Sequence, residues 1–470
     1  MFYMIFIYLV LQTSICNAEL EVKPIATVDL DHDVSSSNSC SSGTSGLDCV
    51  RSRLEEAYAY VRPELGGQDE LSDADKIFLA LHDKPNYWQA TDQDTLKQVL
   101  IIHRHGDRTP INFPPQDNVA NEPFWQFHGL GQLTNRGKAR LHLLGRIIRE
   151  RYDEFLQKSV NKNIRKSRSS GALRCIESAQ VFLSSFMALT KDRRSPDSAA
   201  LIWDKPSNEL SQIWQPASVN TLAAKYDALL NEGAKCNNAE AVYADLDDSE
   251  ENKRLMKEYS HERETLKREL GFEVDHFYKW FWASSLIEVE KSYFGDKLKP
   301  AITAIYDRLE EAGNMALVLF QTPKPLRRAR VGLLIDDIIK NMVDTTKSST
   351  SPFNKKFVHY SAHDINLVFL LGVLDNIKKF PYRPDYASNI IFELHEDKGE
   401  WFVKFFYMPH VPSKFRELNI EACEQGHKRK RCTLSKFSEL MKEFRVSSWW
   451  SWMQECDNPL ENMDPYEQNS

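Results

Sequence analysis

Cysteines separated by two residues, and histidine–cysteine clusters with the spacing of a zinc site, do not occur in this sequence. Apolar runs long enough to cross a membrane are absent after residue 18. Basic residues are in deficit, and the formal net charge of −7 argues against a general nucleic-acid binder. The sequence has no Asn-x-Ser/Thr sequon, so we expect no N-glycosylation. A Walker phosphate loop is excluded as well, because the glycine-rich segment 131–137 has the wrong spacing.

The composition is that of a soluble globular protein, with 42% hydrophobic and 27% charged residues. Residues 1–18 form an apolar run that ends in small side chains, and Cys16 and Ala18 lie where a signal peptidase prefers them. We therefore expect a signal peptide cleaved before Glu19 and no membrane span in the mature chain. An uncleaved anchor is the alternative, but the stretch is short for a span.

Seven cysteines remain once Cys16 is removed with the signal peptide. In an oxidising compartment an odd number implies three disulfides and one thiol. Two short loops and one long-range candidate predict the pairs Cys40–Cys49, Cys423–Cys432 and Cys236–Cys456. Cys175 lies in an apolar helical pattern and is the cysteine that we expect to keep its thiol.

Residues 97–110 combine an apolar strand with an unusually charged loop. The β-branched run at 99–102 predicts a buried strand, and its end is the natural position of a ligand site in an open α/β sheet. Arg104 and Arg108 carry forked guanidiniums that suit phosphate oxygens. Their charge disfavours protonation of His105, which leaves a neutral imidazole nucleophile. A solvated basic turn is the alternative.

A second basic segment lies at residues 161–170 and leads into a predicted helix. Arg174 falls at the start of this helix, where the helix dipole adds to its attraction for an anion. We expect the other basic side chains of this segment, namely Arg165, Lys166 and Arg168, to be solvated surface residues.

Residues 356–362 predict another apolar strand, and this strand presents His363 and Asp364 together at its end. A His-Asp pair alone is a weak signal that is typical of surface pairs. Its position between a strand and the apolar helix expected at 367–374 makes it a candidate site. Residues 401–408 are expected to complete an antiparallel hairpin with the strand before them.

Between residues 193 and 300, charged segments with helical spacing replace the strand signals, and we predict a helical insertion over the sheet. The aromatic cluster at 277–282 is interpreted as the core of this insertion rather than as an aromatic binding box. Residues 25–31 resemble the start of haloacid dehalogenase phosphatases, but no βαβ unit follows them. We interpret them as part of a solvated acidic tail.

Four of these segments resemble the conserved blocks of the histidine acid phosphatases. Residues 104–110, RHGDRTP, have the family's form RHGxRxP. GLGQLTNRG at 129–137 and LGRIIRERY at 144–152 are similar to its second block. The spacing R-S-S-x-x-x-R that ends at Arg174 resembles the third block, and SAHD at 361–364 resembles the fourth.

The resemblance covers roughly residues 97–456 and implies an α/β fold. This fold is a mostly parallel central sheet with helices on both faces plus an inserted helical cap domain. The boundaries that we predict are 1–18 for the signal peptide, 19–95 for a partly low-complexity N-terminal extension, 96–192 and 301–456 for the phosphatase core, 193–300 for the cap and 457–470 for a tail.

The resemblance also implies roles for particular side chains. His105 would be the nucleophile and Asp364 the general acid. The side chains that hold the phosphoryl oxygens would be Arg104, Arg108, Arg174 and His363. No metal and no cofactor is implied, because the arginines supply the positive charge. Neighbouring cations lower the pKa of Asp364, which must be protonated to act, so activity should favour acid pH.

The function that the resemblance implies is that of a secreted or lysosomal acid phosphatase acting on small-molecule phosphomonoesters, and a homodimer is compatible with it. One alternative is an inositol-polyphosphate (phytase-like) phosphatase, since that related group also has an extension before the first motif. A phosphoglycerate mutase-like transferase is disfavoured by the His-Asp pair. The alternative from another class is an inactive secreted binding protein on the same scaffold, which the intact catalytic positions oppose.

Overall fold

The structure is a computed structural model that describes residues 92–156, 164–188, 216–231, 233–347, 356–425 and 431–457. The expected signal peptide, the N-terminal extension up to residue 91, the Cys40–Cys49 pair and the tail from residue 458 lie outside these ranges. Residues 189–215, which include the expected start of the cap, lie outside them as well.

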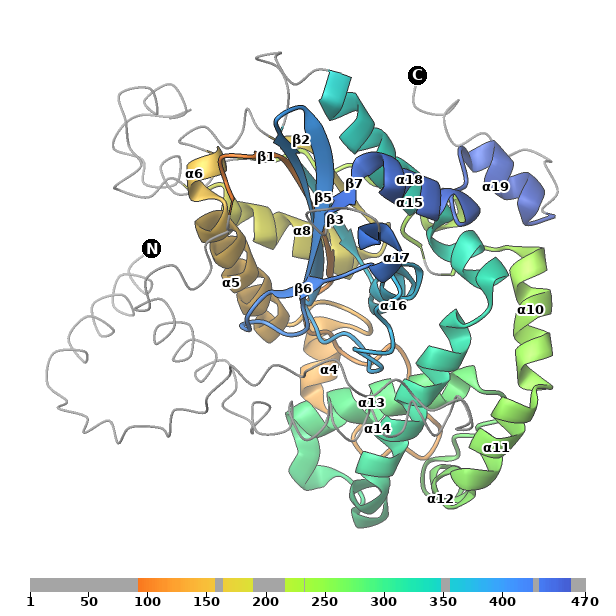
Figure 1. Ribbon diagram of the computed structural model, residues 1–470. Helices are drawn as coiled ribbons and strands as arrows, with labels where there is room; N and C mark the ends of the chain where they lie inside the picture. The colour runs from red at the N-terminus through yellow and green to blue at the C-terminus, as the bar shows by residue number, and fades with distance from the viewer. Residues whose placement is uncertain are drawn as a thin grey trace, which may run out of the picture. The chain divides into compact units, whose positions relative to one another are not determined.

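A seven-stranded sheet forms the centre of the described part of the chain (Figure 1). Its strands are β1 (Leu96–Arg104), β2 (Ile164–Ser169), β3 (Phe357–Ala362), β4 (Asn389–Asp397), β5 (Glu400–Met408), β6 (Arg416–Leu418) and β7 (Cys432–Thr433). The order across the sheet is β2-β3-β1-β4-β5-β6, and β7 pairs with β5. Strands β2, β3 and β1 are parallel, whereas β4 to β7 join the sheet by antiparallel pairing.

The α/β fold class is confirmed, but the expectation of a mostly parallel sheet is wrong. Parallel neighbours need long crossover connections, which the chain provides between β1, β2 and β3. Strands β4 and β5 are joined by Lys398 and Gly399 alone, which have φ values of 56° and 83°. Two central residues with positive φ form the tight turn of an antiparallel hairpin. The expected hairpin at 401–408 is therefore confirmed, and it is one of four antiparallel strand pairings, against two parallel ones, in the described sheet.

The parallel strands end at one edge of the sheet. Arg104 of β1 pairs with Ala362 of β3, and Ser169 of β2 pairs with Ser361 of β3, so the loops that follow all three strands leave from the same edge. Strand β4 runs in the opposite direction, and its first residue, Asn389, pairs with His103. The loop before β4 therefore reaches this edge too.

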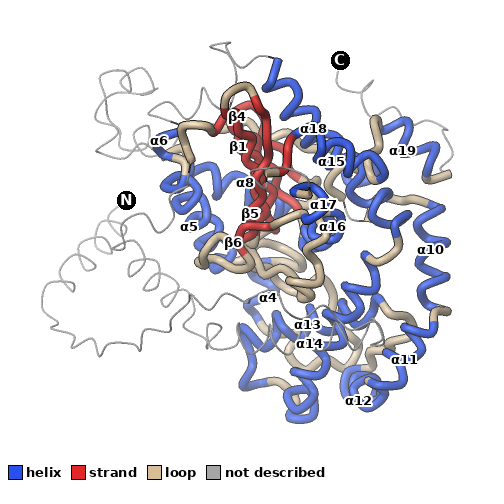
Figure 2. The backbone as a smooth tube through the Cα atoms, in the orientation of Figure 1, coloured by secondary structure: helices blue, strands red, loops and turns tan. Residues whose placement is uncertain are grey.

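Helices cover both faces of the sheet (Figure 2). On one face, α5 (Asn135–Arg151) and α8 (Leu173–Phe186) form a hydrophobic cluster with β1, β3 and β4. The Thr134 side chain caps α5 by accepting a hydrogen bond from the backbone of Gly137. Gly145 allows the two helices to approach, because a Cβ atom there would overlap Phe182 and Ser185.

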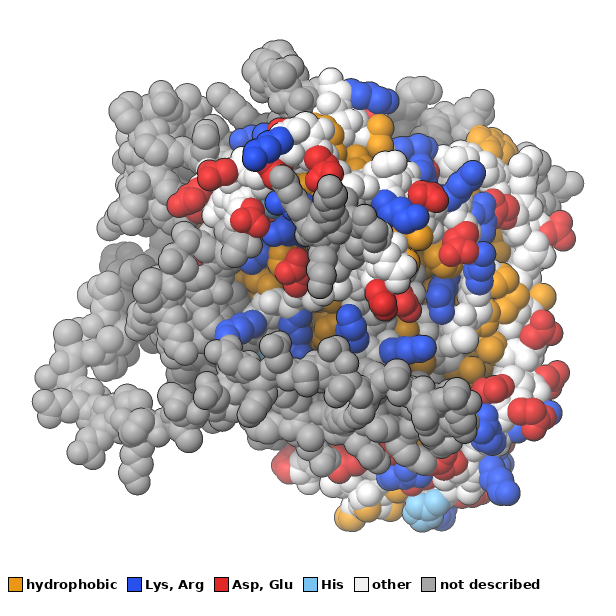
Figure 3. Space-filling model, in the orientation of Figure 1, with side chains coloured by type: hydrophobic (Ala, Val, Ile, Leu, Met, Phe, Trp, Pro, Cys, Tyr) orange, Lys and Arg blue, Asp and Glu red, His pale blue; other side chains and the backbone are white. Residues whose placement is uncertain are grey.

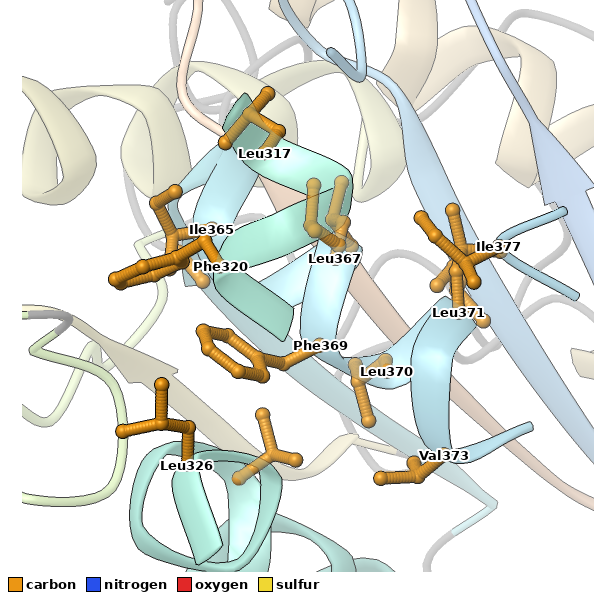
Figure 4. Close-up of a cluster of buried hydrophobic side chains, with 14 of the residues drawn as sticks. Leu317, Phe320, Leu326, Ile365, Leu367, Phe369, Leu370, Leu371, Val373 and Ile377 are labelled. Carbon is orange, nitrogen blue, oxygen red and sulfur yellow. The ribbon is translucent and has the colours of Figure 1, made fainter. Parts of the chain in front are cut away.

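On the other face lie α14 (Pro300–Gln321), α15 (Lys324–Lys347) and α16 (Asp364–Val373). Every residue of α16 is buried, and Figure 4 shows Phe320 of α14 and Leu326 of α15 on one side of Phe369. Fully burying a leucine or phenylalanine contributes about 1.5–3 kcal/mol. A helix enclosed by apolar side chains is held firmly, and this fixes the residues at its start.

The helical insertion contains α10 (Asn237–Asp247), α11 (Glu250–Glu258), α12 (Ser260–Leu270) and α13 (Tyr278–Phe294). Helix α13 packs along α14, and Trp280 and Phe281 are buried in the hydrophobic cluster that also contains α16. The interpretation of this aromatic segment as core is confirmed, although Trp282 is exposed. The shorter helices are α4 (Pro123–His128), α6 (Asp153–Leu156), α17 (Glu421–Glu424), α18 (Leu434–Leu440) and α19 (Trp449–Glu455).

Two of the predicted disulfides are present. Cys236–Cys456 joins the start of α10 to the end of α19, and Cys423–Cys432 joins α17 to β7. Cys175 keeps its thiol and is buried, as expected. These three predictions are confirmed.

The described surface carries charges of both signs, as the composition leads us to expect. Figure 3 shows lysine and arginine side chains interspersed with aspartate and glutamate over the visible face. Among the helices that the structure describes, none combines the length and apolar character that a membrane span requires.

Candidate active site

The loop that follows β1 is held by the backbone of its neighbours. The His105 amide donates to the Ala362 carbonyl at 3.0 Å, and the Ala387 amide donates to the His105 carbonyl at 3.1 Å. Gly106 lies against the first turn of α5, where a Cβ atom would overlap the Gly137 carbonyl. Glycine is required at this position because the two backbones touch. The loop is therefore fixed between β3, α5 and the segment before β4.

His105 presents one ring nitrogen to the site. Its Nδ1 lies 2.8 Å from the Gly106 carbonyl oxygen, which can only accept, so Nδ1 carries the proton and Nε2 carries a lone pair. The His105 ring stands edge-on to that of His363, with 5.6 Å between the ring centroids. Burial lowers the pKa of His105 well below its ordinary value, and the charges of Arg174 and Arg104 lower it further. The imidazole is thus neutral in acid, and its Nε2 keeps the lone pair that a nucleophile requires.

Arg104 is buried at the end of β1 and is held on three sides. Nη1 donates to the Pro384 carbonyl at 2.7 Å, and Nη2 pairs with Oδ2 of Asp364 at 2.9 Å. The guanidinium carbon lies 3.9 Å from the ring centroid of Tyr386. Its Nε–H has no hydrogen-bond partner among the described residues. The guanidinium is positioned rigidly and still has an unused donor.

Arg108 and Arg174 bring two more positive charges. Nη2 of Arg108 donates to Oγ of Ser285 at 3.0 Å, and Nη2 of Arg174 lies 3.5 Å from Nδ1 of His363. Within the described ranges neither arginine has a carboxylate at ion-pair distance, and the Nε–H of each lacks an acceptor. Positive charge held in a buried site without a counter-charge is costly unless an anion binds there. Together with Arg104, these side chains place three guanidiniums beside His105, and we call this cluster the candidate anion site.

His363 is the residue that caps α16. Its backbone amide donates to Oδ1 of Asn366 at 3.0 Å, and its Nε2 lies 2.9 Å from Oγ of Ser170. The thiol of Cys175 is 3.7 Å from the same nitrogen. Burial and the charge of Arg174 lower the pKa of His363 to about 3. His363 is therefore a neutral side chain over most of the acid range.

Asp364 is the first residue of α16. Its Oδ1 accepts from the Ile365 amide at 3.0 Å, and its Oδ2 faces Arg104. Burial alone would raise the pKa of this carboxyl, but the attraction of Arg104 and Arg383 outweighs burial and lowers it. Asp364 is therefore ionised at neutral pH.

A bridge outside this cluster joins two of the loops. Nε of Arg140, on α5, pairs with Oδ2 of Asp107 at 2.9 Å, and its Nη1 pairs with Oδ2 of Asp385 at 2.9 Å. The bridge connects the loop after β1 to the loop before β4. Asp107 is therefore paired with Arg140, and its carboxylate does not neutralise Arg104 or Arg108.

The structure brings the six predicted side chains to one edge of the sheet. They are Arg104, His105, Arg108, Arg174, His363 and Asp364. The prediction that Arg168 is solvated is wrong, because it is buried and pairs with Asp227 at 2.7 Å. Lys166 is half-buried and pairs with Asp337 at 2.7 Å.

Sequence reasoning missed several polar side chains that touch the site residues. Ser178 accepts a hydrogen bond from the Gly106 amide at 3.1 Å, and Ser170 and Ser285 contact His363 and Arg108. Tyr386 covers Arg104. The only signal in the sequence was adjacency, since Ser170 lies inside the segment R-S-S-x-x-x-R that ends at Arg174, whereas Ser285 lies on a helix of the insertion.

In the part of the chain that the structure describes, no group of three or more His, Cys, Asp or Glu side chains is placed to hold a metal ion. The positive charge around His105 comes from arginines. The arrangement therefore offers a nucleophilic imidazole, three guanidiniums and a carboxyl group that can exchange a proton.

Three named relatives illustrate what this chain is similar to. It is 29% identical over 360 residues to prostatic acid phosphatase of Rattus norvegicus, and this alignment covers 75% of this chain and 88% of the relative. It is 28% identical over 361 residues to venom acid phosphatase Acph-1 of Apis mellifera, covering 74% and 85%. It is 28% identical over 368 residues to lysosomal acid phosphatase of Xenopus laevis, covering 75% and 78%.

Solved structures show the same fold. The apo form of the Hafnia alvei phytase superposes with a TM-score of 0.52 at 16% identity, covering 78% of this chain and 98% of the phytase. The phytase from Citrobacter braakii gives a TM-score of 0.50 at 18% identity, covering 77% and 99%. At such low identity the likeness concerns the fold alone.

The sequence profile of the histidine phosphatase superfamily (branch 2) matches residues 95–408, which is more than half of the chain. This range includes the loop after β1, the start of α8 and the start of α16. The resemblance seen in the sequence is thereby confirmed, and the chain belongs to branch 2 of the histidine phosphatase superfamily.

Proposed function

We propose that this protein is an acid phosphatase that hydrolyses phosphomonoesters through a phosphohistidine on His105. The observation that carries the proposal is the state of the His105 ring. Its Nδ1 donates to the Gly106 carbonyl, its Nε2 keeps a lone pair, and three guanidiniums surround it. A neutral nucleophile inside an anion site is what attack on a phosphate ester requires.

The arginines supply the electrostatic part of catalysis. Arg104, Arg108 and Arg174 would hold the nonbridging phosphoryl oxygens, and His363 would donate to them as well. Charge spreads over these oxygens in the transition state of phosphoryl transfer. Guanidiniums that are already fixed, as Arg104 is by Pro384 and Asp364, need no reorganisation at that moment.

Asp364 would deliver the proton that the leaving group needs. The charge of Arg104 keeps Asp364 ionised at neutral pH. A phosphate ester bound to Arg104 offsets this charge, so the pKa of Asp364 rises when substrate binds. Acid pH then favours the protonated carboxyl, whereas His105 stays neutral because its own pKa is lowered.

The reaction balances in two steps. In the first, a bond forms between Nε2 of His105 and phosphorus, the bond from phosphorus to the leaving oxygen breaks, and Asp364 protonates that oxygen. In the second, water attacks phosphorus, Asp364 takes a proton from the water, and the N–P bond breaks to release phosphate.

The test is hydrolysis of p-nitrophenyl phosphate from pH 3 to 8 in the presence of EDTA. We expect activity that is greatest in acid and is unaffected by the chelator. Rapid quenching in alkali, with a substrate labelled on phosphorus, should trap the phosphoryl group on the peptide that contains His105. Loss of activity in EDTA, or label on another residue, would contradict the proposal.

The role of Asp364 has a separate test. Asp364→Asn should slow alkyl phosphates, which have poor leaving groups, roughly a hundredfold more than p-nitrophenyl phosphate, because only poor leaving groups need the proton. An equal loss for both kinds of substrate would refute the role of general acid.

An inactive binding protein is the rival from another functional class. Its prediction is phosphate binding without turnover. The lone pair on His105 and the carboxyl of Asp364 oppose it, because a binding site needs neither group.

We place the protein in a secretory compartment, either outside the cell or in a lysosome. Its two described disulfides require oxidising conditions. The domain division at residues 193 and 300, and a homodimer, remain part of this proposal. Gel filtration of the secreted protein tests the homodimer.

A further inference from the structure

Tyr386 is the residue of the loop before β4 that enters the anion site. The loop reaches the site because β4 is antiparallel to β1, and the Arg104 amide donates to the Ser388 carbonyl at 2.9 Å. Ala387 has a φ of 61°, a left-handed conformation that a residue with a Cβ atom adopts at a cost. This turn directs the preceding side chain across the end of β1.

The Tyr386 ring packs on two of the catalytic candidates. The guanidinium carbon of Arg104 lies 3.9 Å from the centroid of the Tyr386 ring, and this centroid is 5.8 Å from that of the His105 ring. Trp125 and Val289 form a buried hydrophobic cluster with Tyr386. Only 5% of the residue is exposed, so the ring is part of the wall of the site.

The Tyr386 hydroxyl is buried and has no hydrogen-bond partner among the described residues. Leaving such a group unpaired costs about 1–3 kcal/mol. The Arg104 guanidinium lies against the same ring, and the charges of Arg108 and Arg104 both act on the Tyr386 phenol. Burial raises the pKa of Tyr386, and the phenol therefore stays protonated and can donate. What the hydroxyl lacks is an acceptor.

A second tyrosine shows that a buried hydroxyl without a partner does not by itself indicate a binding residue. The Tyr407 hydroxyl is also buried and also lacks a partner in the described ranges. Tyr407, however, lies on β5 and packs edge-on against Phe380 with 4.9 Å between ring centroids. Tyr386 differs because its neighbours are Arg104, Arg108 and His105, which are the groups that a phosphoryl group would approach.

We propose that Tyr386 is a further substrate-binding residue, whose hydroxyl donates a hydrogen bond to a phosphoryl oxygen beside Arg108. The ring at the same time fixes the orientation of Arg104. This inference rests on the proposed phosphatase function and adds a neutral donor to the arginines of the site.

The experiment compares wild type, Tyr386→Phe and the matched control Tyr407→Phe with inorganic phosphate as the probe. Phosphate affinity is measured by calorimetry and as competitive inhibition of p-nitrophenyl phosphate hydrolysis. Because Phe keeps the ring over Arg104 and removes a buried hydroxyl that has no partner among the described residues, Tyr386→Phe should not lower the unfolding midpoint. It should bind phosphate roughly tenfold more weakly and lose about the same factor in kcat/KM, the value of one hydrogen bond to a charged group. Tyr407→Phe should match wild type.

A further readout separates contact with the phosphoryl group from a structural role. The loss in kcat/KM for Tyr386→Phe should be the same for p-nitrophenyl and alkyl phosphates, because the hydroxyl contacts the part that they share. Wild-type phosphate affinity in Tyr386→Phe, or a loss confined to one leaving group, overturns the inference while the phosphatase function stands. A folded wild type that neither binds phosphate nor hydrolyses esters overturns both.

Discussion

Two histidine pairs connect β1 with β3, one inside the sheet and one at its edge. His103 and His359 face each other within the strands, and His105 and His363 follow in the loops. All four side chains are buried, with 3% exposure or less. Burial lowers the pKa of all four. By these measures alone the two pairs are equivalent.

The inner pair is a closed network. The two Nε2 atoms are 2.8 Å apart, Nδ1 of His103 lies 2.8 Å from the Arg104 carbonyl, and Nδ1 of His359 lies 2.8 Å from Oγ of Ser167. Because the carbonyl only accepts, the protons have one consistent order. Ser167 donates to His359, His359 donates to His103, and His103 donates to the backbone. Each ring nitrogen is used within the protein.

The outer pair is open. Its rings are 5.6 Å apart and share no hydrogen bond, and Nε2 of His105 has no hydrogen-bond partner within the described residues. Arg104, Arg108 and Arg174 surround it, whereas the inner pair has no guanidinium among the causes of its pKa shifts. The difference shows that a buried histidine with a low pKa is not by itself a sign of catalysis. Whether a buried histidine can react depends on whether its ring nitrogens are already hydrogen-bonded and on the charge around the ring.

The largest effect on activity should appear when one histidine of each pair is replaced by alanine in turn. His105→Ala should lower kcat by roughly 10⁴-fold or more, because the nucleophile is lost, with little change in unfolding temperature. His103→Ala should keep kcat of the folded protein within about fivefold but destabilise it. Steady-state kinetics and thermal unfolding check both variants. If the two variants behave alike, the comparison fails.

The closed network predicts a stability effect of intermediate size. His359→Leu should lower the free energy of unfolding by roughly 3 kcal/mol, because His103 and Ser167 lose their partner while buried. The double variant His103→Leu/His359→Leu should cost less than the sum of the single changes, since fewer polar atoms are left unpaired. Urea unfolding at pH 7 measures these values. Strict additivity would show that the two rings are not coupled.

Stability should also fall in mild acid. The pKa of His103 is lowered to about 4, so at pH 5 the unfolded chain binds a proton that the folded chain does not. For a group with a normal pKa near 6.5, this lowers the free energy of unfolding by about 2 kcal/mol between pH 7 and pH 5. Urea unfolding at the two pH values tests this. The His103→Leu/His359→Leu variant should show a smaller decrease, and an unchanged decrease would contradict the assignment.

The smallest effect should come from the two serines that contact the pairs. Ser167→Ala removes the donor to His359 and should cost about 1 kcal/mol of stability while leaving kcat/KM within about twofold. Ser170→Ala removes a contact to His363 and should lower kcat/KM about fivefold with a smaller loss of stability. Kinetics and urea unfolding of both variants provide the comparison. Reversed effects would place the active pair inside the sheet.

Much of the site could be predicted because its residues lie in short sequence patterns that can be recognised without the fold. The apolar run before Arg104 predicts a strand whose end carries the charged loop, and the same pattern recurs before His363. Since the ends of parallel neighbouring strands share one edge, two separate motifs could be placed together without a structure.

Other features depend on contacts that no local pattern reports. Arg168 looked like a surface cation, and only the fold brings Asp227 to it. The sheet was expected to be mostly parallel, but the two-residue turn at 398–399 reverses the chain after β4. The antiparallel pairing of β4 with β1 brings Tyr386, in the loop before β4, to the site.

The sequence by itself determined which residue types stand at the ends of the strands, and therefore the class of chemistry. It singled out His105 through the motif RHGDRTP, and it assigned no role to His103, two residues earlier. Only the tertiary structure gave His103 a role, because the partner that closes the inner pair is His359, 256 residues away in the chain. A side chain becomes structural or reactive through the atoms that neighbouring elements bring to it, and their positions are a property of the whole fold.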